Sequence, residues 1–250
     1  MWQYRELVKN LTVSELKNKY QNTSLGFFWT ILSPLLLALV LYFVFRNLFA
    51  EEENFAVNLL VGIMAWRFFA NGTMTCLVSV VYRPSLVTKV YIPREILTLS
   101  AALSSLVSST LEFIVLLPII FVLTGSMPVT VLLFPVIHLL YFIFSLGVGL
   151  LLSALFVYFR DVNQIWEVLL GIIFWVCPIV YPLYLIGPKF ITYYMLNPLT
   201  RLIITYRDVM VSGTVPSGSD FLIVTGYAVG ALIIGYYVFG RLQRRFAEAI

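Results

Sequence analysis

The chain has few charged side chains for its length. Only 11% of its 250 residues are Asp, Glu, Lys or Arg, whereas 61% are hydrophobic. Soluble domains carry about 25% charged residues, so this composition excludes a soluble protein and indicates an integral membrane protein. The net charge of +4 does not require a nucleic-acid partner, because an excess of Lys and Arg on cytoplasmic loops gives the same sign. We therefore expect membrane lipid around the chain and no nucleic acid.

Residues that carry out catalysis or hold cofactors are also scarce. The chain has one histidine, His138, and two cysteines, Cys76 and Cys177, which lie far apart inside apolar runs. They form neither a nucleophile–base pair nor a metal-ligand pattern, and we expect all three to be structural. The phosphate-binding pattern G-x-x-x-x-G-K-[ST] is absent as well. An enzyme is therefore disfavoured, no cofactor is expected on this chain, and any ATP with its Mg²⁺ must be bound by another one.

The sequence does contain a series of long apolar runs. A run of about 20 apolar residues can cross the hydrocarbon core of a membrane as a helix. The runs predict an all-α integral membrane protein with one transmembrane domain over residues 1–250 and six transmembrane helices. The expected spans are residues 27–45, 55–82, 96–123, 129–159, 163–184 and 221–239. We expect the fifth span to kink or break at Pro178 and Pro182, because proline lacks the amide hydrogen and clashes with the preceding turn.

Two further segments are predicted to be helical without crossing the membrane. Residues 1–24 place apolar side chains at helical spacing between lysines and arginines, which indicates an amphipathic helix at the membrane interface. Residues 186–212 are too apolar for a plain loop, and Asn197 followed by Pro198 is typical of a helix start. We expect two short re-entrant gate helices there, between spans five and six. The alternative is a helix that lies flat on the outer surface.

The distribution of basic residues predicts the orientation of the chain. Six spans place both termini on one side, and eleven of the 16 Lys and Arg residues then fall on that side. They are Arg5, Lys9, Lys17, Lys19, Arg83, Lys89, Arg94, Arg160, Arg241, Arg244 and Arg245. Because positive residues favour the cytoplasmic side, we expect both termini in the cytoplasm and residues 186–212 outside.

Two ionisable residues lie inside predicted spans. Arg67 and Glu112 each lie about eleven residues from the outer end of their span, so both come to a similar depth at about 1.5 Å of rise per residue. Such residues usually face a partner or water. We expect either that the two residues pair, or that one of them faces a substrate path. A pair that only locks two helices together is at least as compatible with the sequence.

Aromatic residues are frequent, at 16% of the chain, and some gather in spans two and five. Flat rings with a polar edge suit contact with the faces of sugars, so a path for a carbohydrate polymer is one interpretation. Ordinary helix packing is the other. The candidate path residues are Trp66, Arg67, Phe69, Glu112, Trp166, Phe174, Trp175, Tyr181 and Tyr184.

Five short motifs follow one another along most of the chain. They are residues 20–29 leading to Ser33-Pro34, residues 82–89 with Ile92-Pro93, residues 158–162, residues 178–182 and residues 196–198. Each motif alone is weak, but in this order and spacing they resemble the membrane subunit of ABC-2 type exporters of lipid-linked polysaccharide. These are the permeases for O-antigen, capsule and teichoic-acid polymers. The resemblance implies the type V exporter fold and a place in the cell inner or plasma membrane.

The resemblance also implies partners and roles. It implies a homodimer with two separate ATP-binding-cassette subunits, which bind ATP and Mg²⁺, and a lipid-linked polysaccharide as substrate. The end of the first helix and the segment between spans two and three would contact the ATPase, and the segment from 190 to 211 would form the outer gate. The coupling residues implied are Lys17, Tyr20, Arg83, Pro84, Lys89 and Arg94, and the gate residues are Tyr193, Asn197, Pro198, Arg201 and Tyr206.

Two other functions remain open from the residues alone. An exporter of the same architecture for a drug or a lipid has the same spans. A membrane-embedded transferase acting on lipid-linked sugars needs clustered acidic residues near the inner surface, where the candidates are Glu95, Asp161 and Glu167.

Overall fold

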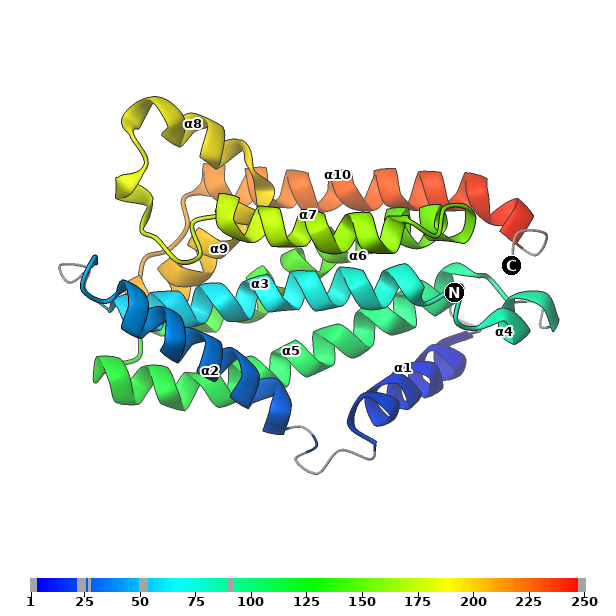
Figure 1. The fold of residues 1–250 in the computed structure, drawn as a ribbon, viewed down its shortest axis with the longest axis horizontal. Coiled ribbons are helices and arrows are strands. Elements are labelled where there is room, and N and C mark those ends of the chain that lie inside the picture. Colours follow the sequence, from blue (N-terminus) through cyan, green and yellow to red (C-terminus); the bar gives the residue numbers. More distant parts are fainter. Residues whose placement is uncertain (1–3, 22–25, 27, 50–53, 90–91, 247–250) are drawn as a thin grey trace.

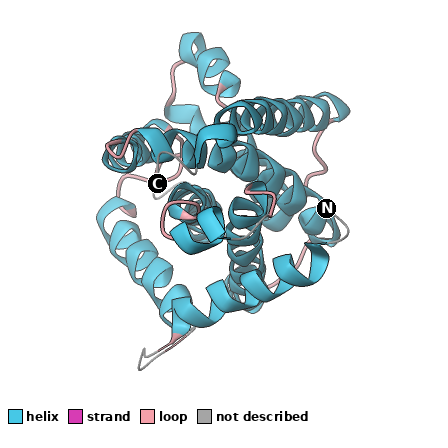
Figure 2. Ribbon diagram, turned by 90° about the vertical axis from the view of Figure 1, so that its right-hand side faces the viewer, coloured by secondary structure: helices cyan, strands magenta, loops and turns pink. Residues whose placement is uncertain are grey.

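The structure is a computed structural model that describes residues 4–21, 26, 28–49, 54–89 and 92–246. Within these residues all regular secondary structure is helical (Figure 2), as the sequence predicts. The long helices run along one axis of the molecule (Figure 1), and both termini lie toward one end of it. We refer to this end as the terminal end. Helices α8 and α9 lie at the opposite end, which we call the α8–α9 end.

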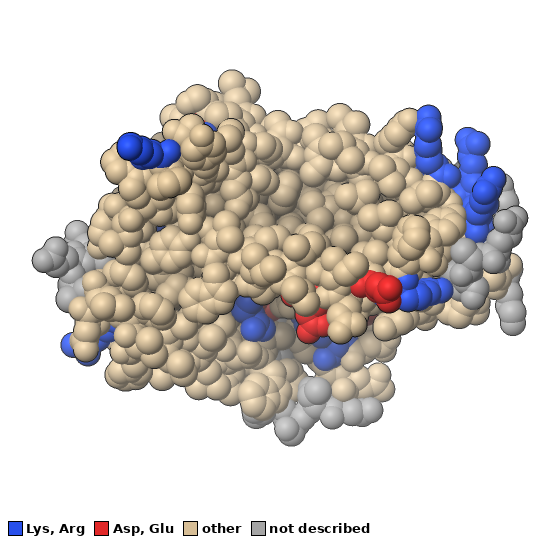
Figure 3. Space-filling view, turned by 45° about the horizontal axis from the view of Figure 1, so that its top comes forward, with Lys and Arg blue, Asp and Glu red and all other residues tan. Residues whose placement is uncertain are grey.

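Five helical segments are long and apolar enough to cross a membrane. They are α2 (Phe28–Phe45), α3 (Phe55–Val78), α5 (Glu95–Thr124), the turn η2 (Val129–Leu133) continued by α6 (Phe134–Tyr158), and α10 (Gly218–Leu242) continued by η5 (Gln243–Arg245). The chain is thus a multi-pass membrane protein. In Figure 3 much of the visible face carries no charged side chain, and Lys and Arg gather at the terminal end.

The fifth predicted span, residues 163–184, is shorter than expected. Helix α7 (Val162–Val176) has 15 residues, about 22 Å at 1.5 Å per residue, against about 30 Å of hydrocarbon. The predicted range 163–184 is wrong at its end, because Pro178 and Pro182 cannot continue the helix. The chain passes into an irregular segment with one short turn, η3 (Leu183–Leu185). Six spans therefore stay a prediction.

Two other predicted boundaries differ for similar reasons. The second span ends at Val78 rather than residue 82, and a turn leads to the short helix α4 (Pro84–Lys89). Pro84 restricts the residue before it to extended conformations and is favourable in a first helical turn. The regular α-helix of the fourth span begins at Phe134 rather than 129, with Pro135 in its first turn.

Helix α3 lies at the centre of the bundle and packs against α2, α5, α6, α7 and α9. Most of its residues are buried, whereas α2 and α10 expose many of theirs. The most extensive contact between two helices joins α6 and α10. A Cβ atom added to Gly235 would lie 2.0 Å from the carbonyl oxygen of Gly147, so the two backbones meet there without side chains between them.

The predicted amphipathic helix is α1 (Arg5–Tyr20), which packs against α5. It runs obliquely to the long helices in Figure 1. The Tyr20 hydroxyl lies 3.1 Å from Ser108 Oγ, and Thr12 Oγ1 donates to the Ser100 carbonyl at 3.4 Å. Of the predicted range 1–24, residues 1–3 and 22–24 lie outside the described residues.

The segment 186–212 forms two short helices, as predicted. Helix α8 (Pro188–Leu196) is largely exposed, whereas α9 (Pro198–Arg207) packs into the core against α3. Asn197 caps α9, because its side-chain oxygen accepts the Leu199 amide at 3.0 Å. A π-helical turn, η4 (Asp208–Ser212), follows.

Candidate functional site

An ion pair joins α1 to the segment that follows α3 at the terminal end. Arg83 Nη2 lies 2.6 Å from Glu15 Oε1, and both side chains are only about one-fifth exposed, at 18% and 21%. The guanidinium of Arg94 donates to the Gln243 carbonyl, which connects the start of α5 to the end of α10. The segment from 83 to 94 thus contacts both ends of the chain.

The other predicted coupling residues have different surroundings. Tyr20 is half-buried against α5, Lys17 is exposed on α1, and Pro84 begins α4. Lys89 ends α4, but its side chain lies outside the described residues. The Arg83–Glu15 pair thus connects α1 to the residue that directly precedes α4.

Arg67 and Glu112 do not form an ion pair. Arg67 Nη1 donates to Ser33 Oγ on α2 at 3.1 Å, while the described ion pairs within 4.0 Å join other residues. Glu112 is buried at 5% exposure, within electrostatic range of Arg67 and Lys19. The prediction of a direct pair is thus wrong, because α2 supplies the hydrogen-bond acceptor. The alternative, that one residue faces a path, stays a prediction.

Four of the predicted path aromatics form one packed cluster between α3 and α7. The ring of Trp66 lies 5.9 Å from that of Phe174, and the ring of Phe69 lies 6.1 Å from that of Trp166. Trp166 Nε1 also donates to Thr73 Oγ1 at 3.0 Å. These contacts agree with the helix-packing interpretation, and Phe69 is almost fully buried within the single chain.

The remaining path aromatics lie at the end of α7. The Tyr181 hydroxyl lies 3.0 Å from the carbonyl oxygens of both Trp175 and Val176, so its one hydrogen can be donated to either carbonyl at the end of the interrupted helix. Trp175 and Tyr184 are exposed, at 54% and 61%. Of the predicted set, these two present the largest free aromatic surface.

Some of the predicted gate residues are held by burial, hydrogen bonds or ion pairs, and others are exposed. Tyr206 is fully buried, and its hydroxyl lies 2.7 Å from His138 Nδ1. Rings of α3, α5 and α6 surround this pair. His138 thus has the structural position that the sequence predicts. Arg201 forms an ion pair with Asp220 at 2.6 Å and donates to the Met195 carbonyl at 2.5 Å, whereas Tyr193 is exposed on α8.

Arg207 is the residue that sequence reasoning missed. Its guanidinium donates to the carbonyls of Asn58 at 2.9 Å, and of Pro178 and Ile179 at 2.7 Å each. One side chain of α9 thereby joins α3 to the irregular segment after α7. Two prolines close together imply unpaired carbonyls nearby, so an arginine in the segment that follows them was a usable signal. Gly62 leaves the space, because a Cβ there would lie 2.7 Å from Arg207 Nη2.

The arrangement defines a helical membrane protein with the polar helix α1 beside the bundle and short, interrupted helices at the α8–α9 end. Residues 6–211 match the ABC-2 type transporter family, and the chain belongs to that family. It is 31% identical to the O-antigen export system permease protein RfbA of Myxococcus xanthus, over all of this chain and 97% of the relative. It is 28% identical to the RfbA protein of Klebsiella pneumoniae, over 98% and 95% of the two chains. The polysialic acid transport protein KpsM of Escherichia coli is 23% identical, over 91% and 90%.

Proposed function

We propose that this chain is the membrane subunit of an ATP-driven exporter that moves lipid-linked polysaccharide out of the cytoplasm. The observation that carries the proposal is similarity over nearly the full length to two proteins named O-antigen export permeases, with the polysialic acid transport protein as a third relative. The sequence lacks a phosphate-binding loop, which supports placing ATP and Mg²⁺ on a separate subunit.

In this proposal two copies of the chain assemble with two ATP-binding-cassette subunits in the cell inner membrane. Both termini face the cytoplasm, so the terminal end carries the coupling residues. Closure of the ATPase pair would push on α1 and α4, which the Arg83–Glu15 ion pair joins. The contact between Arg94 and Gln243 would pass the same motion to α10.

The substrate path would run between the two copies, with α7 at its wall. Trp175 and Tyr184 expose ring surface near the α8–α9 end, and flat rings suit sliding contact with sugar faces. Trp66, Phe69, Trp166 and Phe174 would stabilise this wall from behind. Helices α8 and α9 would form the outer gate, with Tyr206 and Arg201 as its fixed points and Tyr193 at its free surface.

Reconstitution in vesicles tests the proposal. The chain with its ATPase partner is expected to move lipid-linked polysaccharide only when ATP is supplied, and the chain alone is expected to move none. A partner that binds ATP but cannot hydrolyse it serves as the control. Transport by the chain alone would contradict the proposal. ATP-dependent movement of short lipids or drugs but not of polymer would favour the other exporter, and a covalently altered glycan would favour the transferase.

A further inference from the structure

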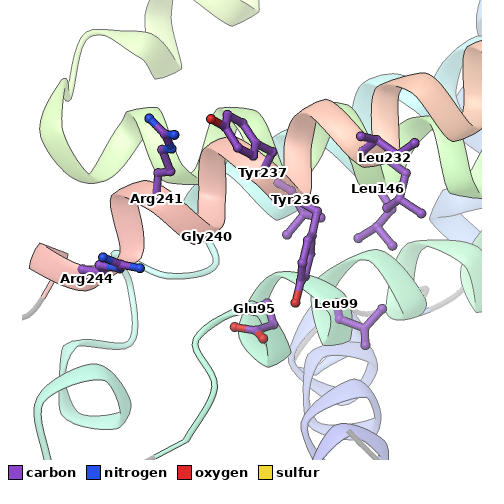
Figure 4. Close-up of a pocket in the computed structure, with 11 residues that line it drawn as sticks. Glu95, Leu99, Leu146, Leu232, Tyr236, Tyr237, Gly240, Arg241 and Arg244 are labelled. Atoms are coloured by element: carbon purple, nitrogen blue, oxygen red, sulfur yellow. The ribbon is translucent and has the colours of Figure 1, made fainter.

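A groove at the terminal end has no part in the function proposed above. It lies between α5, α6 and α10 and has a volume of about 830 Å³, within the range of roughly 300–1,000 Å³ that is typical of small-molecule sites. Figure 4 shows its lining residues. They are Glu95, Leu99, Leu146, Leu150, Leu232, Ile233, Tyr236, Tyr237, Gly240, Arg241 and Arg244.

The groove has apolar walls that open to the outside of the bundle. Leucines of α5, α6 and α10 line its inner part, and on α10 the side chain of Ile233 is 63% exposed. Tyr236 is 54% exposed, and in Figure 4 its ring extends from α10 toward α5. In a chain that spans a membrane, an open apolar groove on the bundle surface faces the hydrocarbon chains of lipids.

The end of the groove near the chain terminus is positively charged. Arg241 and Arg244 line it from the last turns of α10, both exposed, and the Arg241 guanidinium lies 4.8 Å from the centre of the Tyr237 ring. Arg245 and Arg94 add positive charge nearby, since Arg94 bonds to the Gln243 carbonyl. Glu95 is the acidic residue of the lining, so the charge at this end is positive overall. Basic clusters at the end of a span attract anionic headgroups.

We propose that this groove binds an anionic phospholipid of the surrounding membrane. An acyl chain would lie along the leucines of α5, α6 and α10, and the headgroup phosphate would contact Arg241 and Arg244. The occupant is a bulk phospholipid rather than the lipid carrier of the substrate, because most of the lining lies on α6 and α10, which carry none of the proposed path residues. Glu95 opposes a bound anion and therefore limits its affinity.

Titration of the purified full-length chain with phosphatidylglycerol, followed by native mass spectrometry, tests the proposal. One Arg near an anionic headgroup contributes about fivefold in affinity. The double variant R241Q/R244Q is therefore expected to bind about 25-fold more weakly. The matched control K9Q/R160Q also removes two exposed positive charges, neither of which lines the groove, and it is expected to change affinity less than threefold. E95Q is expected to bind more tightly.

A pair of glycine variants tests occupancy independently of charge. Gly240 lines the groove and Gly230 does not, and a Cβ atom on either residue of α10 would meet nothing within 4 Å. G240F is expected to exclude the lipid, whereas G230F retains it. Equal losses of affinity in R241Q/R244Q and K9Q/R160Q, weaker binding in E95Q, or equal binding of phosphatidylcholine would overturn the proposal. Displacement of phosphatidylglycerol by stoichiometric polyprenyl phosphate would instead make the groove a carrier site and overturn it as well.

Discussion

At the scale of single residues, Arg207 shows how one side chain stabilises an interrupted helix. The carbonyls of Pro178 and Ile179 lie beyond the end of α7, and the guanidinium of Arg207 donates to both, as well as to Asn58. A hydrogen bond to a charged group contributes about 1.5–3 kcal/mol, and a buried carbonyl left without a donor is costly. The α8–α9 end therefore depends on a residue that has no role in the predicted gate.

We expect R207A to lower the free energy of unfolding by about 3 kcal/mol, and R207K to restore only part of it. A lysine retains the charge but lacks the planar fork that reaches three carbonyls. Thermal unfolding of the purified protein in detergent measures the change. The control is R160A, which removes an exposed arginine. Equal stability of R207A and the wild type would show that the three hydrogen bonds do not hold this end together.

Asp208 makes the same region sensitive to pH. Burial raises the pKa of its carboxyl group above the ordinary value of 3.8, and repulsion from Asp220 adds to this, while Thr214 and Arg207 oppose it. A raised pKa means that the folded state favours the protonated form. Protonation of Asp208 therefore stabilises the folded state. This stabilisation is complete below about pH 4 and is lost as the pH rises through the raised pKa.

We expect D208N to unfold at a higher temperature than the wild type at pH 7, and at a similar temperature at pH 4. The amide cannot ionise, so it lacks the cost of the buried charge. Because Asp208 is partly exposed, the gain is expected to be small, a few degrees at most. The matched control is D161N on an exposed turn. A D208N profile parallel to that of the wild type over this pH range would refute the assignment.

Residue positions show the limit of reasoning from sequence. The presence and depth of Arg67 and Glu112 follow from their place in apolar runs, but their partners do not. Arg67 is bonded to Ser33, which belongs to a different helix, and no local pattern connects residues 33 and 67. Asn197 was predicted correctly, because a helix cap depends on its immediate neighbours.

At the scale of elements, the glycines between α6 and α10 explain the most extensive helix contact. A methyl group on Gly235 would lie 2.0 Å from the Gly147 carbonyl oxygen, well inside van der Waals contact. The helices would have to separate, and overpacking of this kind costs about 1–3 kcal/mol.

We expect G235A to lower stability by about that amount, although alanine is the better helix former. The matched control is G230A on the same helix, where a Cβ atom meets nothing within 4 Å. That variant is expected to gain up to about 1 kcal/mol from helix propensity. Denaturant unfolding of both variants in one detergent gives the comparison. A gain of stability in G235A would mean that α10 can move away from α6 without cost.

The ion pair between α1 and α4 gives a prediction about coupling. The pair is partly exposed, so removing it is expected to change stability by about 1 kcal/mol or less. R83Q and E15Q are each expected to reduce ATP-dependent transport several-fold, because α1 and α4 would no longer move together. The exchanged variant E15R/R83E restores the attraction and is expected to recover much of the transport. Failure of this exchange, with normal assembly of the complex, would make the pair structural only.

Helices were predictable where composition decides them, and their ends were not. Long apolar runs gave α2, α3, α5, α6 and α10 to within a few residues at most boundaries. The end of α7 was placed eight residues too far, although the two prolines beyond it were the correct signal. The spacing of the apolar residues in α9 follows its buried face. That this face packs against α3 is a contact between distant segments, which local periodicity does not identify.

At the scale of the whole molecule, the number of spans depends on α7. Its 15 residues are too few for a straight span, yet the irregular segment up to α8 continues toward the α8–α9 end in Figure 1. Backbone without helical hydrogen bonds is tolerated at membrane depth when protein covers it. Arg207 donates to two carbonyls of this segment, and the Tyr181 hydroxyl contacts carbonyls in the last turn of α7. Six spans therefore require that α7 and this segment cross the membrane together.

Single introduced cysteines test this topology in intact cells. With six spans and cytoplasmic termini, R160C and R245C are expected to react with a membrane-impermeant maleimide only after permeabilisation. K189C, at the start of α8, is expected to react at least tenfold faster than both in intact cells. The native Cys76 and Cys177 are buried, so background labelling of the parent chain is expected to be low. Labelling of R160C and K189C from the same side would show that α7 does not cross the membrane. The chain would then have five spans and its termini would face opposite sides, so the prediction from the positive residues that both termini are cytoplasmic would be wrong.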